Sequence, residues 1–182
     1  MTSKPLAGPR IGHLVLNVRD IQASHRFYTE VIGMEQCGEL GEGNRIGMMR
    51  FYRGDRDYHH HLALVQTKHE ADEVQPWTIL NTHVGVNHIA LAYPDRDTWL
   101  ARLKLVQETG WKFLVRGNHG MTHSLYLQDP DGNGVELVYD LPNEVWEGDV
   151  NAALNYFDYM PNEGDDALED PTDYKVFTPS DT

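Results

Sequence analysis

Two runs of alternating apolar and polar residues stand out along the chain, IGHLVLNV from Ile11 and VNHIALAY from Val86. Each run has a histidine at its head. In the first run His13, Val15 and Asn17 fall on one face, and leucine and valine fall on the other. A period of two is typical of a half-buried β-strand. The paired histidines are 75 residues apart, so the pattern predicts an internal repeat.

The residues after each run continue the repeat. A helical spacing of apolar residues covers 20–32 and 95–109, and Gly33 and Gly110 follow as predicted helix caps. Three strand-like stretches come next in each half. They are 33–40, 46–53 and 60–66 in the first half, and 111–116, 124–128 and 135–140 in the second. The segment DPDGNG, residues 129–134, predicts a hairpin turn between the last two.

Each half therefore reads as strand, helix and three strands. We expect an α+β protein in which tandem βαβββ modules form a curved, partly closed mixed sheet around a metal cleft. The predicted divisions are a first module at 8–66, a connector at 67–85, a second module at 86–141 and an acidic C-terminal extension at 142–182. Residues 150–159 predict a short amphipathic helix. It either covers the cleft with aromatic side chains or packs on the outside or on a partner subunit.

Charge and composition narrow the classes of function. The chain has 182 residues and a net charge of −13, which argues against nucleic-acid binding. Residues 140–182 hold twelve acidic residues and one basic residue, a balance of −11 that leaves −2 for the rest. Cys37 is the single cysteine, and neither a secretory signal nor a membrane span is predicted. We expect a cytoplasmic protein without a membrane partner.

Three residues are candidates for one metal site. His13 and His88 head the two repeated strands, and Glu136 lies inside the apolar run GVELVY. Burying a glutamate in such a strand is costly unless it is paired or ligated. The fold expected above brings the inward faces of these strands together.

The strongest matches to a known family are the opening LVLNVRDIQASHRFYTEVIGM and the ending HGMTHSLYLQDPDGNGVELVYD. With the βαβββ duplication, they resemble the vicinal oxygen chelate superfamily of glyoxalases, bleomycin-resistance proteins and extradiol dioxygenases. The resemblance covers roughly residues 10–141. The second-half ending resembles the one-domain type I extradiol dioxygenases more than it resembles glyoxalase I.

This resemblance implies a metal centre and a reaction. His13, His88 and Glu136 would be the ligands of Fe(II), with Mn(II) as the alternative metal. Two imidazoles and one carboxylate leave coordination positions open, which suits Fe(II) oxygenases. The implied reaction is the extradiol ring cleavage of a small aromatic diol, of the catechol type, by O2. The family also implies a homo-oligomer.

The resemblance assigns roles to five further residues. His60, in the cluster His59–His61, would be the acid/base residue. His61 is grouped with the substrate-binding residues. If the register is shifted by one, His61 faces inward instead, at the position where glyoxalases have a fourth metal ligand. Tyr126 would hydrogen-bond the metal-bound substrate oxygen. His119 and His123 flank the GMT turn, and either would help to position the substrate.

Two other functions remain open at this stage. A glyoxalase-like, metal-dependent isomerase needs a fourth protein ligand, and His61 is the one residue of HHHLAL that could serve. The other function is that of a non-catalytic sequestering protein of the bleomycin-resistance type, which binds a basic drug in an acidic cleft. The acidic extension favours this function, but such proteins lack the three metal ligands, which this chain has. Metal content separates this last class from the other two.

Overall fold

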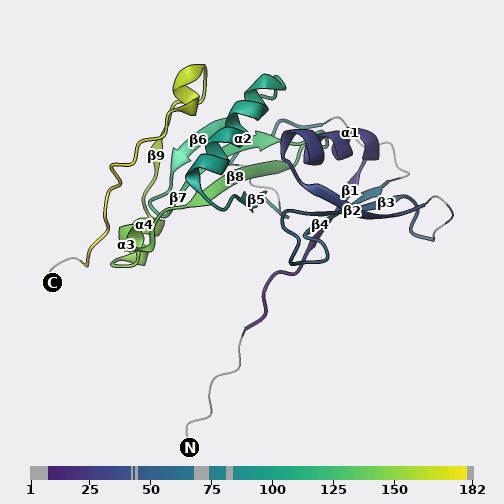
Figure 1. Cartoon of the computed structure of the whole chain (residues 1–182), viewed down its shortest axis with the longest axis horizontal. Coiled ribbons are helices and arrows are strands. Elements are labelled where there is room, and N and C mark those ends of the chain that lie inside the picture. Colours follow the sequence, from purple (N-terminus) through teal and green to yellow (C-terminus); the bar gives the residue numbers. More distant parts are fainter. Residues whose placement is uncertain (1–7, 42, 44, 68–73, 81–83, 180–182) are drawn as a thin grey trace, which may run out of the picture. The chain divides into compact units, whose positions relative to one another are not determined.

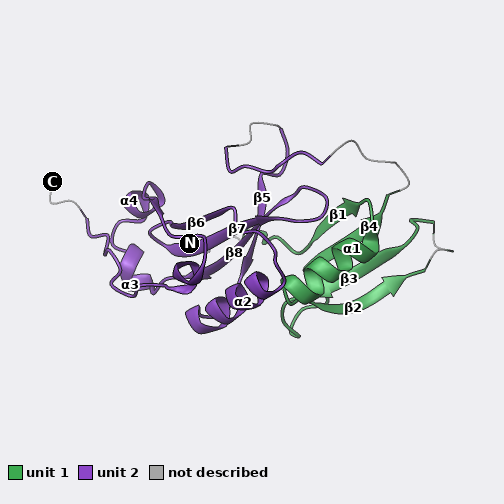
Figure 2. Ribbon diagram, turned by 90° about the horizontal axis from the view of Figure 1, so that it is seen from above, with its two compact units in different colours: residues 1–71 green, residues 72–182 purple. Residues whose placement is uncertain are grey.

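The computed structural model describes residues 8–41, 43, 45–67, 74–80 and 84–179. The chain divides into two compact units, Met1–Ala71 and Asp72–Thr182 (Figure 2). The boundary falls inside the segment predicted as a connector, of which residues 68–73 and 81–83 lie outside the described residues.

Unit 1 consists of one sheet and one helical segment. Its elements in chain order are β1 (Leu14–Val18), α1 (Ile21–Arg26), η1 (Phe27–Val31), β2 (Glu35–Leu40), β3 (Met49–Arg53) and β4 (Leu62–Gln66). The strand order is β1-β4-β3-β2. Strand β1 runs parallel to β4, and the other neighbours are antiparallel. This is the βαβββ order that the sequence predicts.

Local chemistry explains the helical segment of unit 1. The Asp20 carboxylate accepts hydrogen bonds from the amides of Gln22 and Ala23 and so caps the start of α1. The last turn is wider than an α-turn, because the Ile32 amide donates to the Phe27 carbonyl five residues back. Gly33 then ends the helix with φ of 91°, a left-handed conformation that favours glycine.

Unit 2 repeats this order and adds an extension. Its elements are β5 (His88–Ala92), α2 (Arg96–Glu108), β6 (Val115–Asn118), β7 (Thr122–Gln128), β8 (Gly134–Asp140), α3 (Asn143–Trp146), α4 (Val150–Leu154), β9 (Asp158–Tyr159) and η2 (Asp165–Leu168). The strand order is β5-β8-β7-β6-β9. The last strand belongs to the extension, which therefore adds an edge to the module's sheet (Figure 1).

Helix α2 covers one face of the second sheet (Figure 1). Its Trp99, Leu103 and Val106 are buried at helical spacing, and the Trp99 indole donates to the Leu137 carbonyl at 2.9 Å. The predicted hairpin turn is confirmed between β7 and β8, where the Asp129 carboxylate accepts from the amides of Asp131 and Asn133. The other face of this sheet is not covered by α2, and it carries the candidate site described below.

The predicted α+β class and the tandem βαβββ order are confirmed. The strands form two separate open sheets, one in each unit, rather than one partly closed sheet. The predicted helix at 150–159 is shorter than expected, because α4 ends at Leu154 and Asp158 and Tyr159 form β9. Within the described residues, no helix has the length and hydropathy needed to cross a membrane.

Candidate metal-binding site

Strand register places three of the predicted site residues on the open face of the second sheet. Ala90 in β5 pairs with Glu136 in β8, and Glu136 pairs with Tyr126 in β7. His88 lies two residues before Ala90, so strand alternation puts its side chain on the same face. The alternate positions of β7 and β8 hold buried leucines, Leu125, Leu127 and Leu137, so these lie on the other face. The hairpin and the parallel pair thus bring His88, Tyr126 and Glu136 together.

The ring of His88 faces the carboxylate of Glu136. Its Nε2 lies 3.1 Å from Glu136 Oε2, and its Nδ1 lies 2.8 Å from Asn87 Oδ1. The other end of the Asn87 amide donates to the Ile79 carbonyl, which identifies Oδ1 as the atom toward His88. An amide oxygen only accepts hydrogen bonds, so Nδ1 of His88 carries the hydrogen that is donated to it.

This tautomer leaves two electron pairs facing each other. A neutral His88 presents the lone pair of Nε2 to a carboxylate oxygen, and the two atoms repel unless a positive centre lies between them. Either a proton or a metal ion meets that need. Two metal ligands at bond lengths of about 2.1 Å and a right angle are about 3 Å apart. The His88–Glu136 pair therefore fits two neighbouring ligands of one divalent ion.

Tyr126 and His119 extend the site from the carboxylate. The Tyr126 hydroxyl donates to Glu136 Oε1 at 2.8 Å, and His119 Nε2 lies 3.0 Å from the same hydroxyl. Burial, followed by the charge of Glu136, raises the pKa of Tyr126 far above its usual value. Burial lowers the pKa of His119. Near neutral pH the site thus offers a protonated phenol and a neutral imidazole.

His123 lies on the opposite face of the same sheet. It pairs with Tyr139 and is one residue out of phase with Tyr126 and Ser124, and it is 1% exposed. Its Nδ1 is 2.8 Å from the Asp170 carboxylate. Its ring packs edge-on against Tyr174 of the extension. Of the two histidines that flank the turn, His119 is therefore the one that reaches the site face.

Two residues that the sequence analysis does not single out hold this site in place. Trp77 stacks on Tyr126 with ring centroids 5.6 Å apart and an interplanar angle of 13°. A Cβ on Gly134 would lie 2.1 Å from its Nε1, so the indole lies directly on the strand beside Glu136. Asn87 sets the tautomer of His88. The sequence shows that an amide side chain, Asn87, directly precedes His88. Trp77 lies outside the alternating and helical patterns, so the sequence does not indicate its role.

Unit 1 holds the remaining predicted residues. His13 is exposed just before β1, and its ring centroid is 4.5 Å from that of His60. His60 Nδ1 is 2.6 Å from His59 Nδ1. Burial, and then the charges of His59 and His13, lower the pKa of His60. A largely neutral imidazole therefore lies beside the predicted ligand His13.

His61 points toward a neighbouring loop. Its Nδ1 accepts a hydrogen bond from the Gly54 amide at 3.2 Å, which leaves Nε2 to face the Asp55 carboxylate at 3.5 Å. Its ring also packs against Tyr58. Of the two register alternatives, His60 is thus the residue whose ring packs against His13.

The described residues contain no group of three His, Cys, Asp or Glu side chains arranged to hold a metal ion by themselves. His88 and Glu136, two of the three predicted ligands, lie together in unit 2. His13, the third predicted ligand, belongs to unit 1.

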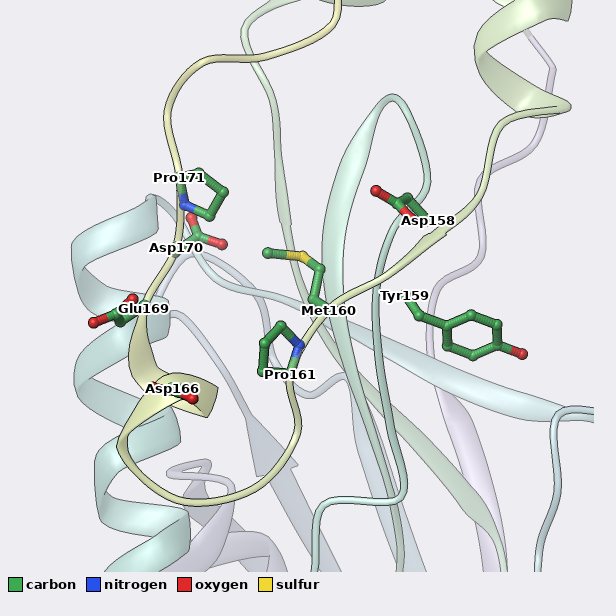
Figure 3. Close-up of a pocket in the computed structure, with 8 residues that line it drawn as sticks. All are labelled: Asp158, Tyr159, Met160, Pro161, Asp166, Glu169, Asp170 and Pro171. Carbon is green, nitrogen blue, oxygen red and sulfur yellow. The ribbon is translucent and has the colours of Figure 1, made fainter.

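The extension has a separate surface hollow of about 660 Å³ (Figure 3). Residues of the extension line it: Asp158, Tyr159, Met160, Pro161, Asp166, Glu169, Asp170 and Pro171. The side chain of Asp170 turns inward, where it bonds Arg116, Arg96, His123 and Tyr139. None of the predicted site residues lines this hollow.

Two βαβββ modules, each opened by a strand with a histidine at its head, define a protein of the vicinal oxygen chelate class. A family model confirms the class and the predicted resemblance: the chain belongs to the Glyoxalase/Bleomycin resistance protein/Dioxygenase superfamily, matched over residues 10–137. The superfamily contains dioxygenases and other enzymes.

The relatives of this chain are named for different activities. The chain is 28% identical over 146 residues to catechol-2,3-dioxygenase of Bacillus subtilis, covering 76% of this chain and 44% of the relative. It is 30% identical over 132 residues to biphenyl-2,3-diol 1,2-dioxygenase 3 of Rhodococcus globerulus, covering 72% and 64%. The chain thus spans less than two thirds of both relatives. The crystal structure of a lactoylglutathione lyase from Agrobacterium tumefaciens has a TM-score of 0.52 at 23% identity, covering 75% and 96%.

Proposed function

We propose that the chain is an extradiol ring-cleavage dioxygenase that uses Fe(II) to open a catechol-type aromatic diol with O2. The observation that carries the proposal is the pair of facing atoms, His88 Nε2 and Glu136 Oε2, with the Tyr126 hydroxyl beside them. Such a pair needs either a proton or a metal ion between its two atoms, and a protonated phenol lies next to it. The relatives named as catechol and biphenyl-diol dioxygenases favour this chemistry over others of the superfamily.

His88 and Glu136 would hold the ion together with His13 from unit 1. This neutral–neutral–anionic set also accepts Mn(II), and it leaves positions for a chelating diol and for O2. When bound, Fe(II) supplies the electron transfer that allows O2 to react with the aromatic ring. We also propose that the modules span residues 8–66 and 86–141 and that copies of the chain assemble into a homo-oligomer.

The chain's own residues would orient the diol and move its protons. Tyr126 is kept protonated by burial, which raises its pKa, and its hydroxyl donates to Glu136 in the absence of a diol. If the hydroxyl turned away from Glu136, it could donate the same hydrogen to a bound diol oxygen. His60, whose pKa is lowered, can take up a hydroxyl proton and return it to the product. In the overall reaction one ring C–C bond beside the two hydroxyl carbons breaks. Both atoms of O2 enter the ring-opened semialdehyde.

Turnover with a colour change tests the proposal. The protein is purified without oxygen, loaded with Fe(II) and mixed in air with catechol and with 2,3-dihydroxybiphenyl. We expect a yellow product that depends on iron and that disappears in His88→Ala. Iron bound at one equivalent without any product, combined with isomerase activity on a glutathione hemithioacetal, would instead indicate a lyase.

His60→Phe separates metal binding from proton transfer. Phenylalanine keeps an aromatic ring against His13 but carries no proton. We expect iron binding to stay normal while turnover falls by about 10²- to 10⁴-fold, the usual contribution of a positioned acid/base. Normal turnover in this variant would remove His60 from the mechanism.

A further inference from the structure

The C-terminal extension brings an aromatic side chain onto the face of the sheet that carries the candidate site. Strand β9 pairs with β6 through Gly117 and Tyr159, and Phe157 directly precedes β9. A Cβ added at Gly117 would lie 2.5 Å from Phe157 Cε2. The ring therefore lies on the side of β6 to which a residue at 117 would point.

That side is the site face. Gly117 pairs with Ser124, two residues from Tyr126 along β7, so strand alternation puts Gly117 and Tyr126 on one face. The ring of Phe157 also packs on His119, with centroids 4.9 Å apart. Because His119 Nε2 is 3.0 Å from the Tyr126 hydroxyl, one imidazole separates Phe157 from Tyr126.

Phe157 remains available to a ligand. It is 38% exposed, and Tyr159, 75% exposed, meets it edge-on at 4.7 Å. Figure 3 shows that Tyr159 points away from Met160 and from the other residues that line the hollow. Phe157 and Tyr159 form an aromatic rim next to His119, which we call the Phe157 rim.

We propose that the Phe157 rim determines substrate specificity, selecting diols that carry an uncharged apolar or aryl substituent. This inference rests on the proposed dioxygenase function, since it takes the two diol oxygens to be bound beside Glu136 and Tyr126. A substituent on the ring then extends past His119 to Phe157. The rim offers aromatic faces and edges to such a group.

The charge next to the Phe157 rim disfavours a substrate that carries a negatively charged substituent. Asp158 lies next to Phe157 in the chain, and burial keeps His119 largely neutral. Lys175, the one basic residue of the extension, lies over the rings of Tyr156 and Phe177. Asp158 is thus the charged residue directly beside Phe157. A diol with a phenyl group should therefore bind well, an unsubstituted diol less well, and a diol with a carboxylate poorly.

Three diols that differ at one ring position test the inference. They are 2,3-dihydroxybiphenyl, catechol and 2,3-dihydroxybenzoate. Their dissociation constants are measured by calorimetry on the Fe(II)-loaded protein without oxygen, and their kcat/KM values are measured in air. Phe157→Ala should lower the preference for the biphenyl diol over catechol by about tenfold, the scale of a lost aromatic contact. The affinity for catechol itself should hardly change.

A second variant tests the role of Phe157 by displacing its ring rather than removing it. Gly117→Ala places a methyl group against Phe157 and should displace it, so the preference should fall in the same direction. Leu154→Ala is the matched control, because Leu154 belongs to the same extension and is 65% exposed. Its preference should equal that of the wild type. Melting temperature and iron content confirm that each variant is folded and loaded.

The outcomes separate the two proposals. Catechol cleavage with an unchanged preference in Phe157→Ala and Gly117→Ala overturns the inference and leaves the dioxygenase standing. A uniform loss of affinity for all three diols also overturns it, because the rim would then hold the site rather than select. A changed mass in solution with unchanged preference would assign the rim to contacts between copies. If none of the diols binds to the iron-loaded wild type, both proposals fall.

Discussion

The βαβββ modules of units 1 and 2 have the same order of strands, but they differ beside the histidines at the heads of their first strands. In unit 2, Ala90 pairs with Glu136, which pairs with Tyr126. In unit 1, the same ladder runs from Val15 through Ala63 to Phe51. An alanine and a phenylalanine therefore take the places of the carboxylate and the phenol.

The surroundings of the histidines differ in the same sense. His88 is oriented by Asn87, whereas His13 follows Gly12, which has no side chain to orient it. Trp77 and the C-terminal extension flank the site face of unit 2. Duplication thus gave each module a histidine, but one module carries the supporting groups.

The largest effect is expected when Glu136 of unit 2 is replaced by alanine, the residue that unit 1 has at the same ladder position. Glu136→Ala removes a proposed ligand and the acceptor of the Tyr126 hydroxyl. We expect iron binding to weaken by more than the about 10- to 100-fold that is typical for residues that only support a ligand, and turnover to vanish. Iron content after gel filtration measures the first and product colour the second. Glu39→Ala, at an exposed carboxylate of unit 1, should leave both unchanged.

Removing the amide before the histidine makes the next largest change. In Asn87→Ala, the Nδ1 hydrogen of His88 loses its acceptor, and the ring is free to turn or change tautomer. Iron affinity should fall by about 10- to 100-fold, which a competition titration with a chelator measures. An unchanged affinity would mean that Glu136 alone orients His88.

Tyr126→Phe gives unit 2 the aromatic residue that unit 1 has at this ladder position. The hydroxyl lost is a donor to Glu136 and a partner of His119. We expect iron content to stay normal and kcat/KM to fall by about tenfold, the value of one hydrogen bond to a charged group. A loss of iron instead would show that the phenol supports the carboxylate more than the substrate.

The sequence predicts the repeat well because both modules obey local rules. Alternation marks the strands, Asp20 and Asp95 cap the helices, and Gly33 and Gly110 end them with positive φ. These features depend on neighbours within a few residues. For the same reason the hairpin at 129–134 and the pairing of Tyr126 with Glu136 follow from the sequence once the turn is known.

Features that depend on distant residues are not predictable in this way. His119 and His123 flank one turn, and strand phase alone decides that His119 reaches Tyr126 while His123 faces the other side. Trp77 comes from an irregular segment and meets Tyr126 across 49 positions of the chain. The buried Asp170 finds Arg116 only when the extension folds back. No period in the sequence marks such contacts.

The extension, which unit 1 lacks, gives the prediction with the smallest effect on the site itself. The Asp170 carboxylate is fully buried against Arg116, with further hydrogen bonds from His123 and Tyr139. Burial alone would raise the pKa of Asp170, but these hydrogen bonds and the charge of Arg116 outweigh it and lower the pKa. Asp170→Asn leaves Arg116 without its counter-ion and should cost about 3 kcal/mol of unfolding free energy at pH 7.

The pH dependence of that cost follows from the lowered pKa. The ionised carboxylate stabilises the fold fully above the unfolded-state pKa of about 3.9. This stabilisation is lost as the pH falls through the lower pKa of the folded state. The gap in unfolding free energy between wild type and Asp170→Asn should therefore stay constant from pH 7 to 5 and shrink below about pH 4. Urea denaturation at each pH measures the gap, and Asp173→Asn, at an exposed carboxylate, is the control. A gap that persists to the lowest pH would mean that the shape of residue 170, rather than its charge, holds the extension in place.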